Sequence, residues 1–152
     1  MPSLILRTAL LIGLLDGLDA VLFTLALGGS PPRMFQGIAS GLVGRDAAMS
    51  GGVATVALGV ACHLTVAAGV ATVYALAALR LRPLTEHAWL AGAVYGVLVW
   101  AVMRWGVIPL SAIGAPRPLT PVGLANALFA HVALVGWPAA LMARGHLTQG
   151  KS

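Results

Sequence analysis

The chain has 152 residues, of which 59% are hydrophobic and only 9% are charged, and its formal net charge is +5. Soluble domains carry about 25% charged residues, so this composition argues against a water-soluble protein and predicts an integral membrane protein. The nine Lys and Arg residues are scattered between apolar runs, a pattern that points to the lipid bilayer and away from a nucleic-acid partner.

Four apolar stretches approach the length of about 20 residues that a membrane-spanning helix needs. They are Thr8 to Leu27, Val53 to Leu79, Ala88 to Ile108 and Val122 to Met142. Lipid offers no hydrogen-bond partners to the backbone, so each stretch is expected to be an α-helix. The sequence therefore predicts one all-α membrane domain over residues 1–152, folded as a bundle of four transmembrane helices.

The first connection, from Gly29 to Gly52, is the longest. It places Phe35, Ile38 and Leu42 at helical spacing, which predicts a short helix lying at the membrane surface. The last stretch is preceded by Thr120 and Pro121, which are suited to be the N-cap and the first residue of a helix.

Lys and Arg residues are more frequent on the side of the membrane that holds the two termini. That side carries Arg7, Arg80, Arg82, Arg144 and Lys151, and the opposite side carries Arg33, Arg45 and Arg117. Positive residues favour the cytoplasmic side, so we expect both termini in the cytoplasm.

Small residues indicate how the helices pack. Close approach of helices in lipid depends on small side chains, and Gly13-x-x-x-Gly17 and Gly92-x-x-x-Gly96 provide two such faces. The second stretch has one continuous stripe that is expected to face the other helices. It consists of Val56, Gly59, His63, Ala67, Val70 and Tyr74.

Four polar residues lie deep inside apolar stretches. Asp16 and Asp19 interrupt the first stretch, and His63 and His131 lie near the centres of the second and fourth. An Asp at the bilayer centre opposes insertion by roughly 2.5 to 3.5 kcal/mol, so these residues are expected to face inward and find partners. They predict a buried Asp/His cluster near the midplane.

Arg104 in the third stretch is displaced from the centre toward the same surface as Asp19. An ion pair between Asp19 and Arg104 would neutralise two costly charges. The alternative is that Arg104 extends its long side chain to the membrane surface beside Trp105.

Three functions remain open from these residues. Neighbouring His and Asp side chains in a low-dielectric interior can hold protons, which suits proton- or ion-linked transport. The cluster could instead serve helix packing in an accessory subunit that docks on a membrane protein partner or a second copy. His63 and His131 could also ligate haem, or join Asp16 around a divalent metal, in an electron-transfer bundle.

Motifs for catalysis and for cofactors are missing from the sequence. It contains no H-E-x-x-H, C-x-x-C or G-x-S-x-G pattern. We therefore expect neither an enzyme nor a resident cofactor, and a metal or haem at His63 and His131 stays the alternative.

Three segments together resemble a group of small four-span bacterial inner-membrane proteins with no assigned activity. They are Gln36 to Gly44 (QGIASGLVG), Ala57 to His63 (ALGVACH) and Val107 to Ser111 (VIPLS). The resemblance implies a four-helix fold in a bacterial inner membrane and brings no activity. The group has an Asn in the third span where this chain has Arg104, so an Asp19 to Arg104 pair would not be a shared feature.

Overall fold

The computed structural model describes residues 1–116 and 118–149. Arg117 and Lys151, both used in the charge count, lie outside these residues. The described residues are mostly helical and contain no β-strand.

Four helical stretches of the described residues are long and apolar enough to cross a membrane. Two are uninterrupted α-helices, α1 (Pro2–Ala26) and α4 (Gly52–Arg80). The third span, Ala88–Leu110, and the fourth, Pro121–Thr148, each contain a π-helical segment. The third consists of α6 (Ala88–Val102), η1 (Met103–Val107) and α7 (Ile108–Leu110), and the fourth of α8 (Pro121–Phe129), η2 (Ala130–Gly136) and α9 (Trp137–Gln149). The prediction of an all-α chain with four candidate membrane-spanning helices is confirmed.

The outer surface of these helices is apolar. Six exposed leucines on α1 follow one another at intervals of three or four residues, which places them along one side of the helix. They are Leu6, Leu10, Leu14, Leu18, Leu22 and Leu25. Large apolar stripes of this kind are rarely exposed to water, whereas lipid is a suitable neighbour for them.

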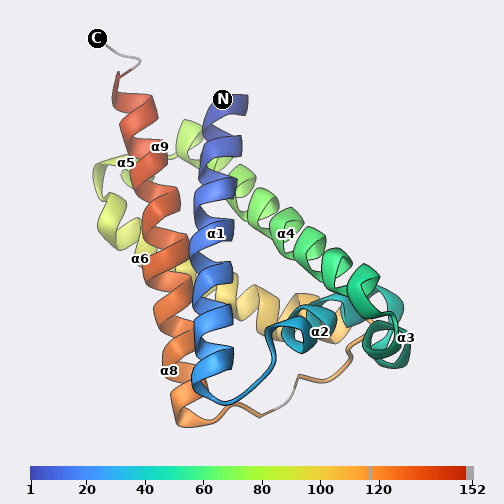
Figure 1. Cartoon of the computed structure of the whole chain (residues 1–152). Helices are drawn as coiled ribbons and strands as arrows, with labels where there is room; N and C mark the ends of the chain where they lie inside the picture. The colour runs from blue at the N-terminus through green and yellow to red at the C-terminus, as the bar shows by residue number, and fades with distance from the viewer. Residues whose placement is uncertain (117, 150–152) are drawn as a thin grey trace.

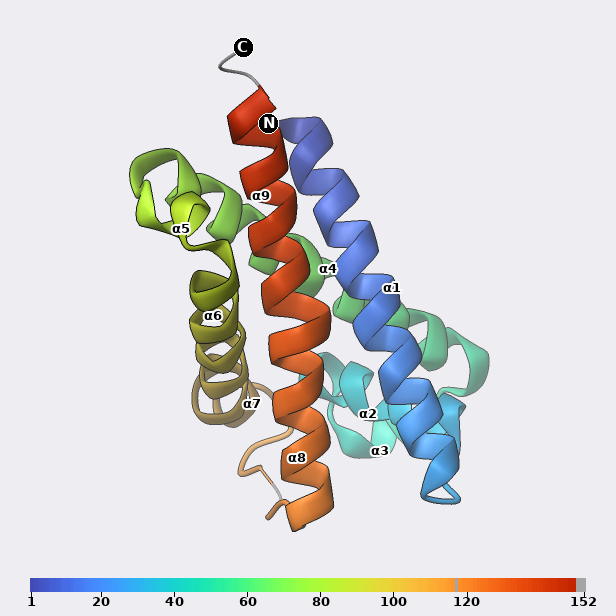
Figure 2. The ribbon, with the colours of Figure 1, turned by 90° about the vertical axis from the view of Figure 1, so that its left-hand side faces the viewer.

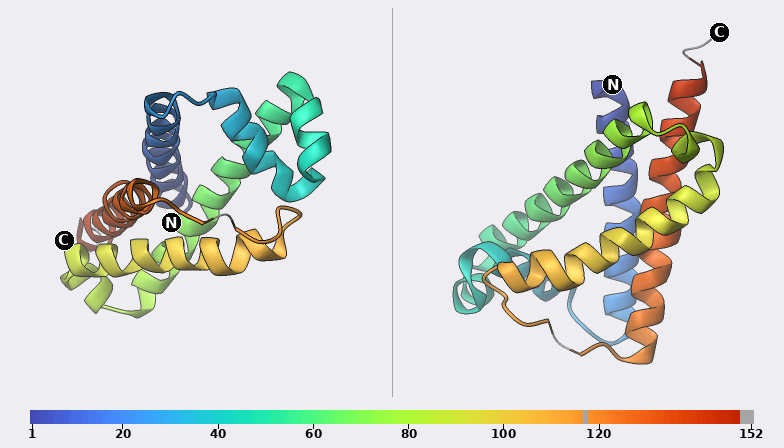
Figure 3. Two further views of the ribbon diagram at one scale, coloured as in Figure 1. Left: turned by 90° about the horizontal axis from the view of Figure 1, so that it is seen from below. Right: turned by 180° about the vertical axis from the view of Figure 1, so that it is seen from behind.

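α1 and the fourth span stand side by side, and α4 and the third span cross them obliquely (Figures 1 and 3). α4 packs on α1 and α9, whereas the third span packs on η2 and α9. The start of α1 and the end of α9 lie at the same end of the molecule, which we call the terminal end (Figure 2). This arrangement leaves α4 and the third span as the less closely packed pair of neighbours.

Glycines allow two helix pairs to approach closely, as the sequence predicts. A Cβ atom on Gly13 would lie 3.0 Å from a methyl of Leu64 on α4. On the third span, a Cβ on Gly92 would lie 2.8 Å from the carbonyl oxygen of Gly136, and one on Gly96 would overlap the carbonyl of His131. Both predicted glycine faces are therefore in use, with α1 against α4 and with the third span against the fourth.

The long first connection contains two helices where the sequence predicts one. α2 (Pro31–Val43) and α3 (Arg45–Ser50) are separated by Gly44, whose φ of +79° favours glycine. α2 packs on the first part of α4, where a Cβ on Gly59 would overlap the carbonyl of Phe35. Gln36 is buried in this contact and donates hydrogen bonds of 3.3 Å to Gly52 O and Thr55 Oγ1.

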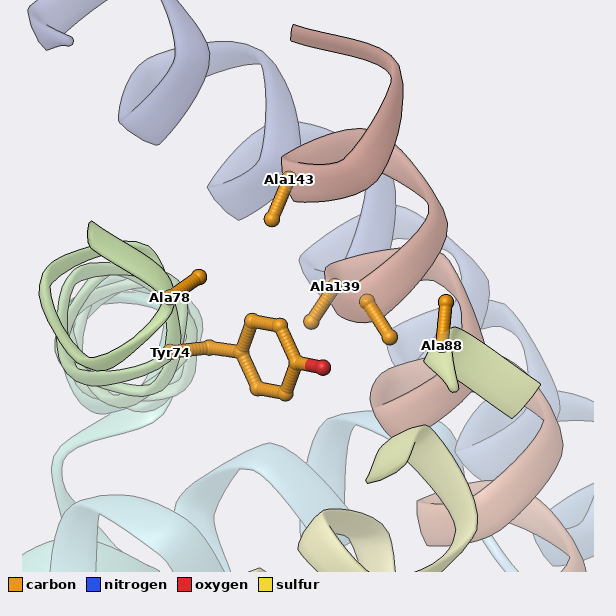
Figure 4. Close-up of a cluster of buried hydrophobic side chains, with 6 residues drawn as sticks. Tyr74, Ala78, Ala88, Ala139 and Ala143 are labelled. Carbon is orange, nitrogen blue, oxygen red and sulfur yellow. The ribbon is translucent and has the colours of Figure 1, made fainter. Parts of the chain in front are cut away.

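A cluster of small side chains surrounds Tyr74 near the terminal end (Figure 4). Tyr74 is 1% exposed, and its hydroxyl donates a 2.9 Å hydrogen bond to the carbonyl oxygen of Leu84 in the short helix α5 (Pro83–Glu86). The other buried members are Ala78, Ala88, Ala139, Ala140 and Ala143. Alanines permit close contact of α9 with α4 and with α6, so this end of the molecule is tightly packed.

Candidate functional site: a polar cavity among the four spans

The two π-helical segments occupy corresponding places before prolines. η1 ends two residues before Pro109, and η2 ends two residues before Pro138. Proline has no N–H and its ring clashes with the carbonyl four residues earlier, and these carbonyls, of Trp105 and Leu134, lie inside the π-helical segments. The wider π turn relieves this clash and changes the direction of the residues around it.

A cavity of about 330 Å³ lies among the four spans and α2. Both π-helical segments contribute to its wall, through Met103 and Arg104 of η1 and through His131 and Val135 of η2. Most of the remaining wall is apolar. The polar side chains in it are Asp16, His63, Arg104 and His131, with the indole of Trp100 nearby.

Asp16 and His63 face each other across the contact between α1 and α4. The Nδ1 atom of His63 lies 3.9 Å from Asp16 Oδ2, and the side chains are 16% and 25% exposed. The other imidazole nitrogen, Nε2, lies 2.8 Å from the carbonyl oxygen of Gly13. A carbonyl only accepts, so Nε2 carries a proton and donates it to this bond. In the neutral imidazole, Nδ1 is therefore an acceptor that faces a carboxylate.

Gly17 makes this approach possible. A Cβ atom at position 17 would lie 3.2 Å from His63 Nε2, so a larger residue would push the imidazole away from α1. The predicted stripe on the second span is also found, since Gly59, Ala67 and Tyr74 are buried while His63 and Val70 line the cavity.

His131 is oriented by its own helix. Its Nδ1 lies 2.9 Å from the carbonyl oxygen of Ala127, four residues earlier, and must be the donor in that bond. In an α-helix the backbone N–H of His131 would donate to the carbonyl of Ala127, four residues earlier. In a π-helix each backbone N–H donates to the carbonyl five residues earlier, which leaves the Ala127 carbonyl available to the imidazole. The Nε2 atom of neutral His131 is then left as an acceptor on the cavity wall.

Asp19 lies one turn beyond Asp16 and has a partner that the sequence analysis missed. The amide of Asn126 on α8 donates a 2.9 Å hydrogen bond to Asp19 Oδ2. Asn126 is the lone carboxamide in the fourth apolar stretch, and this isolation was the available signal. The Asp19 to Arg104 ion pair stays a prediction, and Arg104 lies on the wall of the cavity together with Asp16.

The structure brings the four predicted site residues into one neighbourhood. Asp16, His63 and His131 share the cavity wall, and Asp16 also interacts electrostatically with Asp19. Asp16 and Arg104 lie on the cavity wall, and Asp19 lies near Asp16. With both carboxylates ionised and both imidazoles neutral, these groups sum to one negative charge. A net charge in an apolar interior is costly, and a bound proton or cation would remove it.

The cavity is directed away from the terminal end. Its wall includes Leu119, in the connection that crosses the end of the molecule opposite the terminal end (Figure 3), and Ile38 of α2. At the other end, Val70 and Val135 are each followed one turn later by the tightly packed Tyr74 and Ala139 (Figure 4). The packing thus favours access from the α2 side.

Metal and haem remain alternatives without direct support. Within residues 1–116 and 118–149, no group of three or more His, Cys, Asp and Glu side chains is placed to hold a metal ion. In each imidazole, one nitrogen is already bonded to a backbone carbonyl, which leaves Nδ1 of His63 and Nε2 of His131 for any ligand. The exposed His87 and His146 take no part in this site.

No protein-family model matches the chain, and comparisons with curated proteins and with solved structures give no significant match. The resemblance to small four-span bacterial proteins stays a prediction. The functional argument therefore depends on the geometry of the cavity.

Proposed function

We propose that this chain is a multi-pass protein of a bacterial inner membrane that performs proton- or ion-linked transport through the cavity. In this proposal the four spans form a bundle, both termini are cytoplasmic, and α2 with α3 lies at the opposite membrane surface. Asp16 and His63 take up the proton or monovalent cation, and His131 and Asp19 tune the charge around it.

The arrangement of Asp16 and His63 carries the proposal. His63 is held by its bond to Gly13 with the acceptor Nδ1 turned to the carboxylate at 3.9 Å. Two acceptors in this position repel each other unless a proton or cation lies between them. If the proton is on Asp16, both side chains are neutral. If it is on His63, the imidazolium attracts the carboxylate. Uptake of one proton therefore stabilises the pair in either case.

The packing at the two ends of the cavity supports access to the site from one side of the membrane. Access from the α2 side and the close packing around Tyr74 together describe a site that exchanges with one side of the membrane. Transport would then require α4 or the third span to move at the Tyr74 cluster. Such movement is consistent with the loose contact between these two helices.

The test is proton uptake into vesicles that contain the purified protein and a pH-sensitive dye. With a potassium diffusion potential as the driving force, we expect uptake above that of protein-free vesicles. Asp16→Asn and His63→Gln should each reduce it to the protein-free rate. Asp46→Asn is the matched control, because Asp46 is an exposed carboxylate on α3 outside the cavity. Uptake that is equal in all four proteins would contradict the proposal.

Orientation needs its own experiment. Alkaline phosphatase fused to the C-terminus is active only outside the cytoplasm, so we expect an inactive fusion. A fusion to the connection after α1 should be active. The reverse pattern would place α2 in the cytoplasm and overturn the assigned direction.

A further inference from the structure

A second cavity of about 560 Å³ adjoins the first one. α2, α4 and the end of the third span form its walls, and we call it the lipid groove. Leu42, Ala61 and Val107 are wall residues with exposed surfaces, and Cys62 is half-buried there. The groove is therefore accessible from the apolar surface of the protein.

The lipid groove and the polar cavity have a common wall. Four side chains belong to both of them: Ile38, Val66, Met103 and Ile108. Such side chains can change rotamer on a short timescale, and Met in particular adapts to different neighbours. These four side chains line both the groove and the cavity that holds Asp16 and His63.

The helices on either side of this wall are held together mainly on the far side of the cavity. There the Tyr95 hydroxyl of α6 donates a 2.7 Å hydrogen bond to Val70 O of α4, and the rings of Tyr74 and Tyr95 meet edge to face at 4.9 Å. Toward α2, the groove and the cavity occupy the space between the same two helices. The space between α4 and the third span thus lies on the side of α2, away from the Tyr74–Tyr95 contact.

The two ends of this combined space have different chemistry. The groove end is almost entirely apolar. The inner end has the Asp16 carboxylate on its wall with the Asp19 carboxylate near it, two acceptor nitrogens, and the indole of Trp100, whose face attracts an ammonium group. Arg104 lies on the same wall, so with both carboxylates ionised it can balance only one of them.

We infer that the site accepts an amphipathic amine, which enters sideways from the bilayer through the lipid groove and places its ammonium group between Asp16 and His63. This inference rests on the proposed role of Asp16 and His63 as a cation site, and it names the class of the transported cation. The alkyl chain lies in the groove while the ammonium group replaces the proton as the counter-charge of Asp16.

Cys62 allows a direct test, because it is the only cysteine of the chain and lies on the groove wall. The protein in lipid nanodiscs is labelled with N-ethylmaleimide, with and without dodecylamine, and the ratio of the two labelling rates is measured. At ten times the dissociation constant, dodecylamine should slow labelling by about tenfold. Dodecanol at the same membrane concentration is the control for the alkyl chain alone, and it should protect much less.

Variants at both ends of the combined space complete the test. Asp16→Asn should abolish protection by dodecylamine, whereas Asp16→Glu keeps the charge and should retain it. Ala61→Trp fills the groove and should weaken protection of Cys62 by the amine. Ala57→Trp is its matched control, one turn earlier on α4, exposed and outside the groove.

Three results would overturn the inference: no protection by dodecylamine, equal protection by dodecanol, or full protection in Asp16→Asn. Its failure can be distinguished from failure of the proposed function. Proton uptake that depends on Asp16, without protection by the amine, rejects the amine and leaves the proton site. Protection that depends on Asp16, without proton uptake, rejects proton transport and leaves an amine-binding site.

Discussion

Gly96 on the third span lies directly against the backbone carbonyl of His131 on the fourth, with no room for a side chain between them. This contact holds the π-helical segment of the fourth span against α6 and so determines where the imidazole of His131 lies. The first prediction tests it.

Gly96→Ala should destabilise the protein by about 1 to 3 kcal/mol, because the added methyl separates the two helices. Gly69→Ala is the matched control, since Gly69 is also helical but has nothing within 4 Å of the added Cβ. Unfolding of both variants in mixed micelles with increasing SDS measures the difference. Equal stability of the two variants would show that the helices do not depend on this close contact.

Removal of the amide at position 126 should leave the Asp19 carboxylate without its donor. Asn126→Ala is expected to cost about 1 to 2 kcal/mol in the same unfolding assay. Asp19→Asn should cost less, because an amide oxygen still accepts from Asn126 and the buried charge is gone. The prediction is wrong if Asn126→Ala unfolds at the same SDS fraction as the unmodified protein.

Pro138→Ala tests whether the π-helical turn matters for proton uptake independently of the stability of the protein. The alanine supplies an N–H and removes the ring clash, so the fourth span can return to α-helical bonding. This return rotates His131 away from the cavity, and we expect reduced proton uptake with unchanged or higher stability. Pro121→Ala, at the first residue of α8, is the control and should keep uptake. Normal uptake in Pro138→Ala would mean that the π turn does not position the site.

Tyr74 is predicted to limit leakage toward the terminal end. Tyr74→Ala should destabilise the protein by about 3 to 5 kcal/mol through the space it leaves, and should raise passive proton leakage of the vesicles. Tyr74→Phe keeps the ring but loses the bond to Leu84 O, so it should cost about 1 kcal/mol and should not leak. Leakage in both variants alike would assign the effect to the hydroxyl group.

Much of the fold follows from the sequence because lipid leaves the backbone little choice. Hydropathy alone located the four spans, but it placed the first at Thr8 whereas α1 begins at Pro2. A helix continues past the apolar core as long as its backbone bonds are made, and hydropathy does not report this. The end of a helix is predictable where a cap is specific. Thr120 Oγ1 accepts from Gly123 N at 3.1 Å, which confirms the N-cap read from the sequence.

The candidate site was less predictable. Depth and periodicity indicated that Asp16, His63 and His131 face inward, because each lies on the small-residue side of its helix or near its centre. The partners depend on helix order and on the local π turns, which arise from Pro109 and Pro138 together with tight packing at Gly96. A periodicity of 3.6 residues per turn describes a regular α-helix and does not predict a change to π-helical bonding. The hydrogen bond from the His131 imidazole to the Ala127 carbonyl was therefore not predicted.

The bond between Asp19 and Asn126 joins residues that are 107 positions apart. α1 carries two carboxylates and leaves the ribosome before α8, so the donor for one of them is synthesised only with the fourth span. Until then α1 is poorly suited to lipid on its own and depends on the insertion machinery or on α4 for shelter. Truncation of the chain before residue 121 should for this reason expose α1 to membrane quality control, so that synthesis of the fourth span acts as a checkpoint for stable insertion.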